Sequence, residues 1–95
     1  MILMEKLHYD ITVKGRVQGV WFRKYTKIKA DELDIQGYVM NLPNGDVFAE
    51  AEGNKEQLKA FVQWLHKGSP HAMVYTVENQ LKEMKDHKYF EIRRY

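Results

Sequence analysis

Residues 7–33 read LHYDITVKGRVQGVWFRKYTKIKADEL, and the spacing of apolar residues changes once along this stretch. In the first eight residues they alternate with polar ones, as in a β-strand that buries one face. From Trp21 onward they recur every three or four residues, as along the buried face of a helix. The predicted strand face is Leu7, Tyr9, Ile11 and Val13, and the predicted helix face is Phe22, Thr26, Ala30 and Leu33, widened by Trp21, Tyr25 and Ile28.

The middle of the chain predicts a β-hairpin followed by a second helix. Residues 35–42 and 47–53 alternate on either side of the turn sequence PNGD, which is typical of a hairpin with a loop longer than two residues. Asn54 and Gln57 have the spacing of a capping box, and Gly68 marks the end of the helix. The apolar positions between them follow the helical period, namely Leu58, Phe61, Val62 and Leu65.

The last third of the chain predicts a strand at residues 72–80 and an optional short strand within residues 88–95. The order β-α-β-β-α-β is the split βαβ, or ferredoxin-like, arrangement of the α+β class. Right-handed crossovers place both helices on one face of a single antiparallel sheet. A chain of 95 residues fits one domain, which we expect to span residues 1–95.

Composition excludes several classes of protein and site. The net charge of +2 is too small to indicate a nucleic-acid or membrane partner. The sequence has no cysteine, which excludes disulfides, thiolate nucleophiles and cysteine-based metal sites. No apolar run approaches the ~18 residues of a membrane span, and the start MILMEKLHYD does not have the pattern of a signal peptide. We therefore expect a cytoplasmic protein.

The loop between the first strand and helix has the composition of an anion-binding site. The first N–H groups of a helix lack partners within it, and the helix dipole favours a negative ligand there. Gly15 and Gly19 allow the backbone to curl so that several N–H groups point inward. Arg23 lies in the first helical turn and can reach the same anion, while Arg16 and Lys24 would enlarge the positive field. The alternative is a glycine turn without a ligand and charges that are merely solvated.

Asn41 is the second candidate, because asparagine is uncommon in strands and this one lies late in a predicted strand. Its amide offers both a donor and an acceptor and is suited to holding a water molecule. Alternatively, Asn41 caps the turn that begins at Pro43. The four histidines are scattered and expected at the surface, and no metal-ligand spacing or known nucleophile motif is visible.

An anion site and a water-holding group without an evident acid or base favour a phosphate ester whose leaving group needs no proton. A carboxylate is such a leaving group, since its conjugate acid has a pKa of about 4. An alkoxide would require a general acid. The residues therefore indicate a mixed carboxylic–phosphoric anhydride as the substrate.

Two glycine-containing motifs resemble those of the acylphosphatase family. The first, Gly-x-Val-Gln-Gly-Val-x-Phe-Arg, is matched in full by Gly15, Val17, Gln18, Gly19, Val20, Phe22 and Arg23. The second, a Gly-aromatic-Val-x-Asn core with later glycines, is matched by Gly37, Tyr38, Val39, Asn41, Gly45, Val47 and Gly53. The likeness extends over nearly the whole chain, although Gly68-Ser69-Pro70 stands where many members have Gly-Pro-Pro.

The resemblance implies a ferredoxin-like monomer that hydrolyses acyl phosphates to carboxylate and inorganic phosphate, with no metal, cofactor, nucleic acid or membrane. By motif position, Arg23 would bind the phosphoryl group and Asn41 would orient the attacking water. The phosphate oxygens would be held by the backbone amides of Arg16, Val17, Gln18, Gly19 and Val20. The substrate phosphate would accept the proton of the water, so that catalysis is positioning and charge stabilisation.

Three other functions fit parts of the sequence. Ferredoxin-like sheets also bind RNA through exposed aromatics, but the motif for that function is absent. A related domain serves carbamoyl phosphate chemistry and in known cases is fused to a larger enzyme. A regulatory domain could use the glycine loop and Arg23 to bind a metabolite without catalysis, but such a binder would not need Asn41 to hold water.

Overall fold

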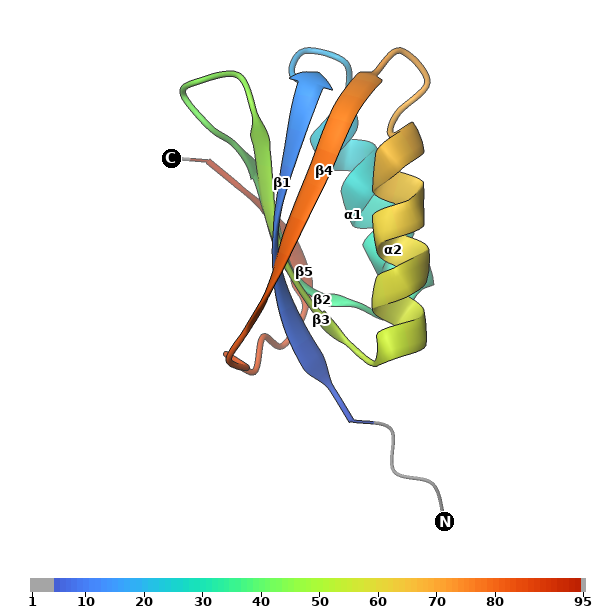
Figure 1. The fold of residues 1–95 in the computed structure, drawn as a ribbon, viewed down its shortest axis with the longest axis vertical. Coiled ribbons are helices and arrows are strands. Elements are labelled where there is room, and N and C mark those ends of the chain that lie inside the picture. The colour runs from blue at the N-terminus through green and yellow to red at the C-terminus, as the bar shows by residue number, and fades with distance from the viewer. Residues whose placement is uncertain (1–4, 95) are drawn as a thin grey trace.

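The computed structural model describes residues 5–94, which form a five-stranded sheet with two helices on one face (Figure 1). In chain order the elements are β1 (Leu7–Arg16), α1 (Phe22–Glu32), β2 (Gln36–Asn41), β3 (Val47–Gly53), α2 (Lys55–Lys67), β4 (Met73–Lys82) and β5 (Phe90–Arg93). The strand order is β4-β1-β3-β2-β5. The first four strands pair antiparallel, whereas β5 joins β2 in parallel. The predicted ferredoxin-like fold is confirmed, and the optional last strand makes the sheet mixed.

The core lies between the sheet and the two helices. The buried strand residues are Ile11, Val13, Val39, Val47, Ala49, Ala51 and Phe90, and the buried apolar helix residues are Phe22, Ala30, Leu58, Phe61 and Leu65. The alternation in β1 and β3 and the helical period in α2 predicted most of these positions. Burial of such side chains away from water is the main force that holds the two layers together.

The apolar flank predicted for α1 is wrong. Trp21, Tyr25 and Ile28 are 69%, 39% and 45% exposed. The small side chains of Thr26 and Ala30 face the sheet, so the helix packs through a narrow stripe and its flank turns toward solvent. Trp21 also precedes the helix, in the left-handed conformation with φ 63°, so the helical period does not fix its direction.

The capping box predicted for α2 is confirmed. The Asn54 side chain accepts from the Gln57 backbone N–H at 2.9 Å, and the Gln57 side chain accepts from the Asn54 backbone N–H at 2.7 Å. The helix ends at Gly68, as predicted. These reciprocal bonds fix where α2 begins after β3 and hence how it covers the sheet.

No helix within residues 5–94 is long and apolar enough to cross a membrane. The two helices have 11 and 13 residues. The apolar start at residues 1–4, on which the signal-peptide prediction rests, lies outside the described residues, as does residue 95.

Candidate active site

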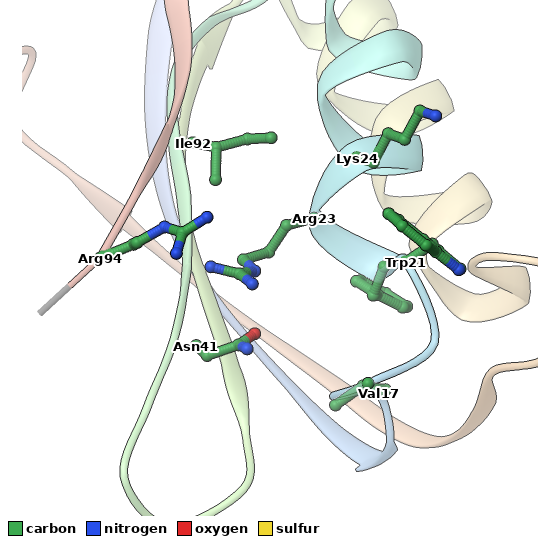
Figure 2. A pocket seen from close by; sticks show the side chains of 9 residues that line it. Val17, Trp21, Arg23, Lys24, Asn41, Ile92 and Arg94 are labelled. Atoms are coloured by element: carbon green, nitrogen blue, oxygen red, sulfur yellow. The ribbon is translucent and has the colours of Figure 1, made fainter.

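A pocket of about 390 Å³ opens where the β1–α1 loop meets the ends of β2 and β5 (Figure 2). Its lining residues are Val17, Gly19, Trp21, Phe22, Arg23, Lys24, Asn41, Ile92 and Arg94. Three of them are cationic and none is acidic, so the pocket attracts anions. It brings the two residues proposed for catalysis, Arg23 and Asn41, to one site.

The β1–α1 loop begins at an irregularity in the sheet. The register between β1 and β4 shifts between Lys14 and Gly15. A Cβ at Gly15 would collide with the backbone oxygen of Met73, so β4 can approach only a glycine here. Gly19 has φ 74° and open space around it, so the loop conformation itself favours glycine.

The curled loop leaves backbone donors free. Within residues 5–94, the N–H groups of residues 17–20 donate to no backbone or side-chain acceptor. The first backbone bond of α1 runs from the Tyr25 N–H to the Trp21 carbonyl at 3.1 Å, so the preceding N–H groups have no partner within the helix. Trp21 offers no side-chain cap, and the first turn contains no acidic residue. These donors and the positive end of the helix dipole suit an anionic ligand.

Two side chains hold this loop in place, and the sequence indicated neither role. The Gln18 side-chain amide donates to the backbone oxygens of Leu42 and Asp46, both at 2.8 Å. The buried Ser69 hydroxyl donates to the backbone oxygen of Val20 at 2.7 Å. Gln18 thereby joins the loop to the β2–β3 turn beside Asn41. Ser69, the residue that departs from Gly-Pro-Pro, joins it to the end of α2.

Arg23 lies partly buried in the first turn of α1, and Figure 2 shows its guanidinium pointing toward Asn41 and Arg94. It forms no ion pair with an acidic residue among residues 5–94. A cation placed against the positive end of a helix dipole is unfavourable by some tenths of a kcal/mol. A bound anion would reverse that effect and match the fork of the guanidinium.

Asn41 is the last residue of β2 and shares its helix-facing side with Gly37 and Val39. Its Oδ1 atom is buried and accepts no hydrogen bond within the described chain. The alternative role for Asn41 was to cap the β2–β3 turn. Other groups close that turn, since the Leu42 N–H donates to the Asp46 oxygen at 2.8 Å. A buried acceptor without a partner lowers the stability of the fold by about 1–3 kcal/mol. This cost indicates that a water or a ligand donates a hydrogen bond to Asn41 Oδ1.

A second polar cluster lies on the opposite face of the sheet, beneath the connection between β4 and β5. It corrects the expectation that every histidine lies at the surface, which holds for His66 and His71 but not for His8. It also groups side chains of metal-ligating type that no spacing in the sequence indicated. His8 is fully buried, with ring nitrogens 2.7 Å from Glu52 and 2.8 Å from Asp10. Two groups have a geometry that could hold a metal ion, His8–Glu52–His87 and His8–Asp10–Glu50.

The register of the sheet explains why the sequence did not indicate this cluster. His8 pairs with Glu52, and Asp10 with Glu50, across β1 and β3. These partners are far apart in sequence, and only the pairing of the two strands places them together. Their hydrogen bonds to one another already satisfy the buried groups.

The two buried glutamates of this cluster have lowered pKa values. Burial by itself would raise the pKa of Glu50, but hydrogen bonds from Lys85, His87 and Tyr38 outweigh it and lower the pKa to about 2. Burial likewise opposes ionisation of Glu52, and hydrogen bonds from His8 and from two backbone N–H groups lower its pKa. Both groups are therefore ionised at neutral pH and hold the β4–β5 connection on the sheet.

Comparison with known proteins identifies close similarity to one family. The acylphosphatase family model matches residues 9–92. The chain is 44% identical to an acylphosphatase of Nitrosococcus oceani over 81 residues, which cover 85% of this chain and 91% of that protein. It is 40% identical to an acylphosphatase of Natronomonas pharaonis over 97% of this chain and 100% of that protein. An acylphosphatase structure from Coxiella burnetii has a TM-score of 0.92 at 35% identity, with 98% of this chain and 100% of that chain covered.

Proposed function

The chain belongs to the acylphosphatase family, and we propose that it hydrolyses acyl phosphates without a metal in the pocket formed by the β1–α1 loop, Arg23 and Asn41. The nine residues that line this pocket include no histidine, cysteine or carboxylate. The donors available there are backbone amides, guanidinium groups and the Asn41 amide, which suit a phosphate better than a cation.

The phosphoryl group is held by the loop and by Arg23. The backbone amides of residues 16–20 surround two or three of its oxygens, and the guanidinium of Arg23 binds it in a bidentate manner. This assignment is supported by the free N–H groups of residues 17–20 and by the position of Val17 and Gly19 in the pocket lining. The charge that develops on the phosphoryl oxygens in the transition state meets donors that are already in place.

Asn41 positions the nucleophile. Its buried, unpartnered Oδ1 is the observation that carries the proposal, because an acceptor at this point can take a hydrogen bond from one water molecule and leave a lone pair of that water free. The water oxygen attacks phosphorus, the bond from phosphorus to the acyl oxygen breaks, and the carboxylate leaves with the bonding electrons. The proton of the water passes to a phosphoryl oxygen, so that no side-chain base is needed.

The absence of an acid among the lining residues limits the leaving group. A carboxylate leaves unprotonated at neutral pH, since its conjugate acid has a pKa of about 4. An alkoxide would have to be protonated as it leaves. The pocket therefore favours acyl phosphates over alkyl phosphates, with aryl phosphates in between. A small molecule as the only partner, a monomeric state and a cytoplasmic location are part of the same proposal.

Release of inorganic phosphate from three substrates, with and without chelator, tests this function. We expect rapid hydrolysis of acetyl phosphate, slow hydrolysis of 4-nitrophenyl phosphate and almost none of glycerol phosphate, at rates that chelator leaves unchanged. Equal rates on the alkyl and acyl substrates would contradict the absence of a general acid. Inhibition by chelator would contradict the metal-free mechanism, and phosphate binding without turnover would favour the regulatory domain.

A further inference from the structure

Arg94 lines the same pocket but was not singled out by the motifs. Arg94 is the residue directly after β5, in which Phe90 is buried toward the helices and Ile92 lines the pocket two residues later. Its side chain lines the same pocket as that of Ile92, and Figure 2 shows it directed toward Arg23. Its neighbour Arg93 faces the other side, where its guanidinium lies 4.0 Å from the centre of the Tyr38 ring.

Figure 2 shows the guanidinium groups of Arg94 and Arg23 pointing toward each other across one space. Neither forms an ion pair with an acidic residue in the described part of the chain, whereas Lys14, Lys85 and Arg93 each have a carboxylate partner. Two like charges that face each other repel, and an anion between or beside them would reverse that repulsion. The arrangement therefore indicates more anion-binding capacity than one phosphoryl group held by Arg23 and the loop requires.

The size and lining of the pocket agree with a second subsite. A volume of about 390 Å³ lies in the range of pockets that enclose small organic molecules, which exceed a phosphate ion in size. Ile92 and Trp21 add apolar surface beyond the loop amides and suit a short carbon chain. Arg94 reaches the pocket from the end of the edge strand β5, whereas the phosphate-binding loop approaches it from β1.

We propose that Arg94 binds a second anionic group, a carboxylate carried by the acyl part of the substrate, so that the enzyme favours monoacyl phosphates of dicarboxylic acids. This inference rests on the proposed acylphosphatase function and adds to it a preference among acyl phosphates. Arg94 is a substrate-binding residue for this class, and it acts on the end of the substrate remote from the phosphorus atom.

The test compares two substrates that differ in one charge, the monoacyl phosphate of glutaric acid and that of its monomethyl ester. The measured quantity is the ratio of kcat/KM for the diacid over the ester, in wild type and in Arg94→Gln, Arg94→Lys and Arg93→Gln. We expect the ratio to fall about fivefold to tenfold in Arg94→Gln, as for loss of a charge-assisted hydrogen bond at a partly solvated site. Arg94→Lys should retain part of the preference for the diacid. Arg93→Gln removes the same charge on the other face of the sheet and should leave the ratio at its wild-type value.

The dependence on ionic strength is a second measurement, and it would not change in Arg94→Gln if Arg94 had only a structural role. In wild type the ratio should decrease as salt rises from 10 to 300 mM, because the ion pair between Arg94 and the substrate carboxylate is partly exposed and is screened by salt. In Arg94→Gln it should be nearly independent of salt. A ratio that is the same in Arg94→Gln and wild type would overturn the second subsite and leave the acylphosphatase function standing. Failure of the wild type to hydrolyse either substrate would overturn the proposed function and this inference with it.

Discussion

Arg23 occupies a position where a positive charge is unfavourable unless an anion is bound. We predict that Arg23→Ala lowers kcat/KM for acetyl phosphate at least about a hundredfold, because a bidentate contact to the phosphoryl group worth about 3 kcal/mol in the transition state is lost. The side chain is only partly buried and has no ion-pair partner among residues 5–94, so the thermal midpoint should change little. Turnover and thermal unfolding measured on one preparation check this. A folded variant with near-normal turnover would rule out the assignment.

Asn41 is expected to separate binding from catalysis. In Asn41→Ala the loop amides and Arg23 remain, so inorganic phosphate should inhibit or bind with nearly its original affinity. The rate should fall by about two orders of magnitude, because the water loses its orientation. Calorimetric titration with phosphate, beside kcat for acetyl phosphate, gives both quantities. If phosphate affinity falls in proportion to the rate, Asn41 instead helps to bind the phosphoryl group.

At the scale of elements, the β1–α1 loop is attached to the β2–β3 turn by the side chain of one of its own residues, Gln18. The side chain of Gln18 bonds the loop to the β2–β3 turn, while its backbone N–H belongs to the proposed cradle. One residue thus joins the loop that we propose to bind phosphate to the turn that follows Asn41. A substitution that removes only the side chain therefore tests positioning without removing an amide.

We predict that Gln18→Ala weakens phosphate binding about tenfold and lowers the free energy of unfolding by about 1–2 kcal/mol, since the carbonyl oxygens of Leu42 and Asp46 each lose one of their two hydrogen-bond donors. Gln36→Ala is a matched control, because its amide bonds only to the exposed Asp34 nearby. Phosphate titration and urea unfolding of both variants measure the two effects. Unchanged phosphate affinity in Gln18→Ala would show that the loop keeps its shape without these hydrogen bonds.

At the scale of the whole molecule, the second polar cluster is a buried network beneath the β4–β5 connection. It links β1 and β3 to the segment that leads into β5. The Glu52 carboxylate accepts from the backbone N–H groups of Lys85 and His87 at 2.6 and 2.8 Å. Glu50 accepts from the side chains of Tyr38, Lys85 and His87. Since β5 carries Ile92 and leads to Arg94, this network also holds one wall of the pocket.

Acid should loosen this network. The pKa values of Glu50 and Glu52 are lowered from an ordinary 4.5, so near that pH the unfolded chain binds protons that the folded protein does not. Their stabilising contribution is complete above pH 4.5 and is lost as the pH falls toward about 2, the pKa of Glu50. For Glu50 alone it is of the order of 3 kcal/mol. We therefore expect the free energy of unfolding to fall steadily over this range.

Glu50→Gln identifies the residue responsible. Its free energy of unfolding should be lower than that of wild type at pH 7 and should approach the wild-type value as the pH falls toward 2. Glu83→Gln, a change at an exposed position, should follow the wild-type curve. Urea unfolding at several pH values provides the comparison. If the curves of Glu50→Gln and wild type run parallel, Glu50 does not account for the acid sensitivity.

Local spacing was enough to predict the elements and part of the site. Alternation in residues 7–14, the helical period after Asn54 and the capping box are properties of neighbouring residues, and backbone geometry converts them directly into strands and helices. The two motifs led to Arg23 and Asn41, which the fold brings into one pocket. The roles proposed for these residues stay predictions until the variants are measured.

What the sequence determined about this protein is therefore the order of its elements, its ferredoxin-like class and its family. Only the tertiary structure decided that His8 meets Glu52, that the Gln18 side chain closes the loop and that Arg94 faces Arg23. These contacts join residues far apart in the chain, and they depend on strand register and on the parallel docking of β5 beside β2. Local periodicity states which face of an element is buried, but the partner of each side chain follows from how the elements pair.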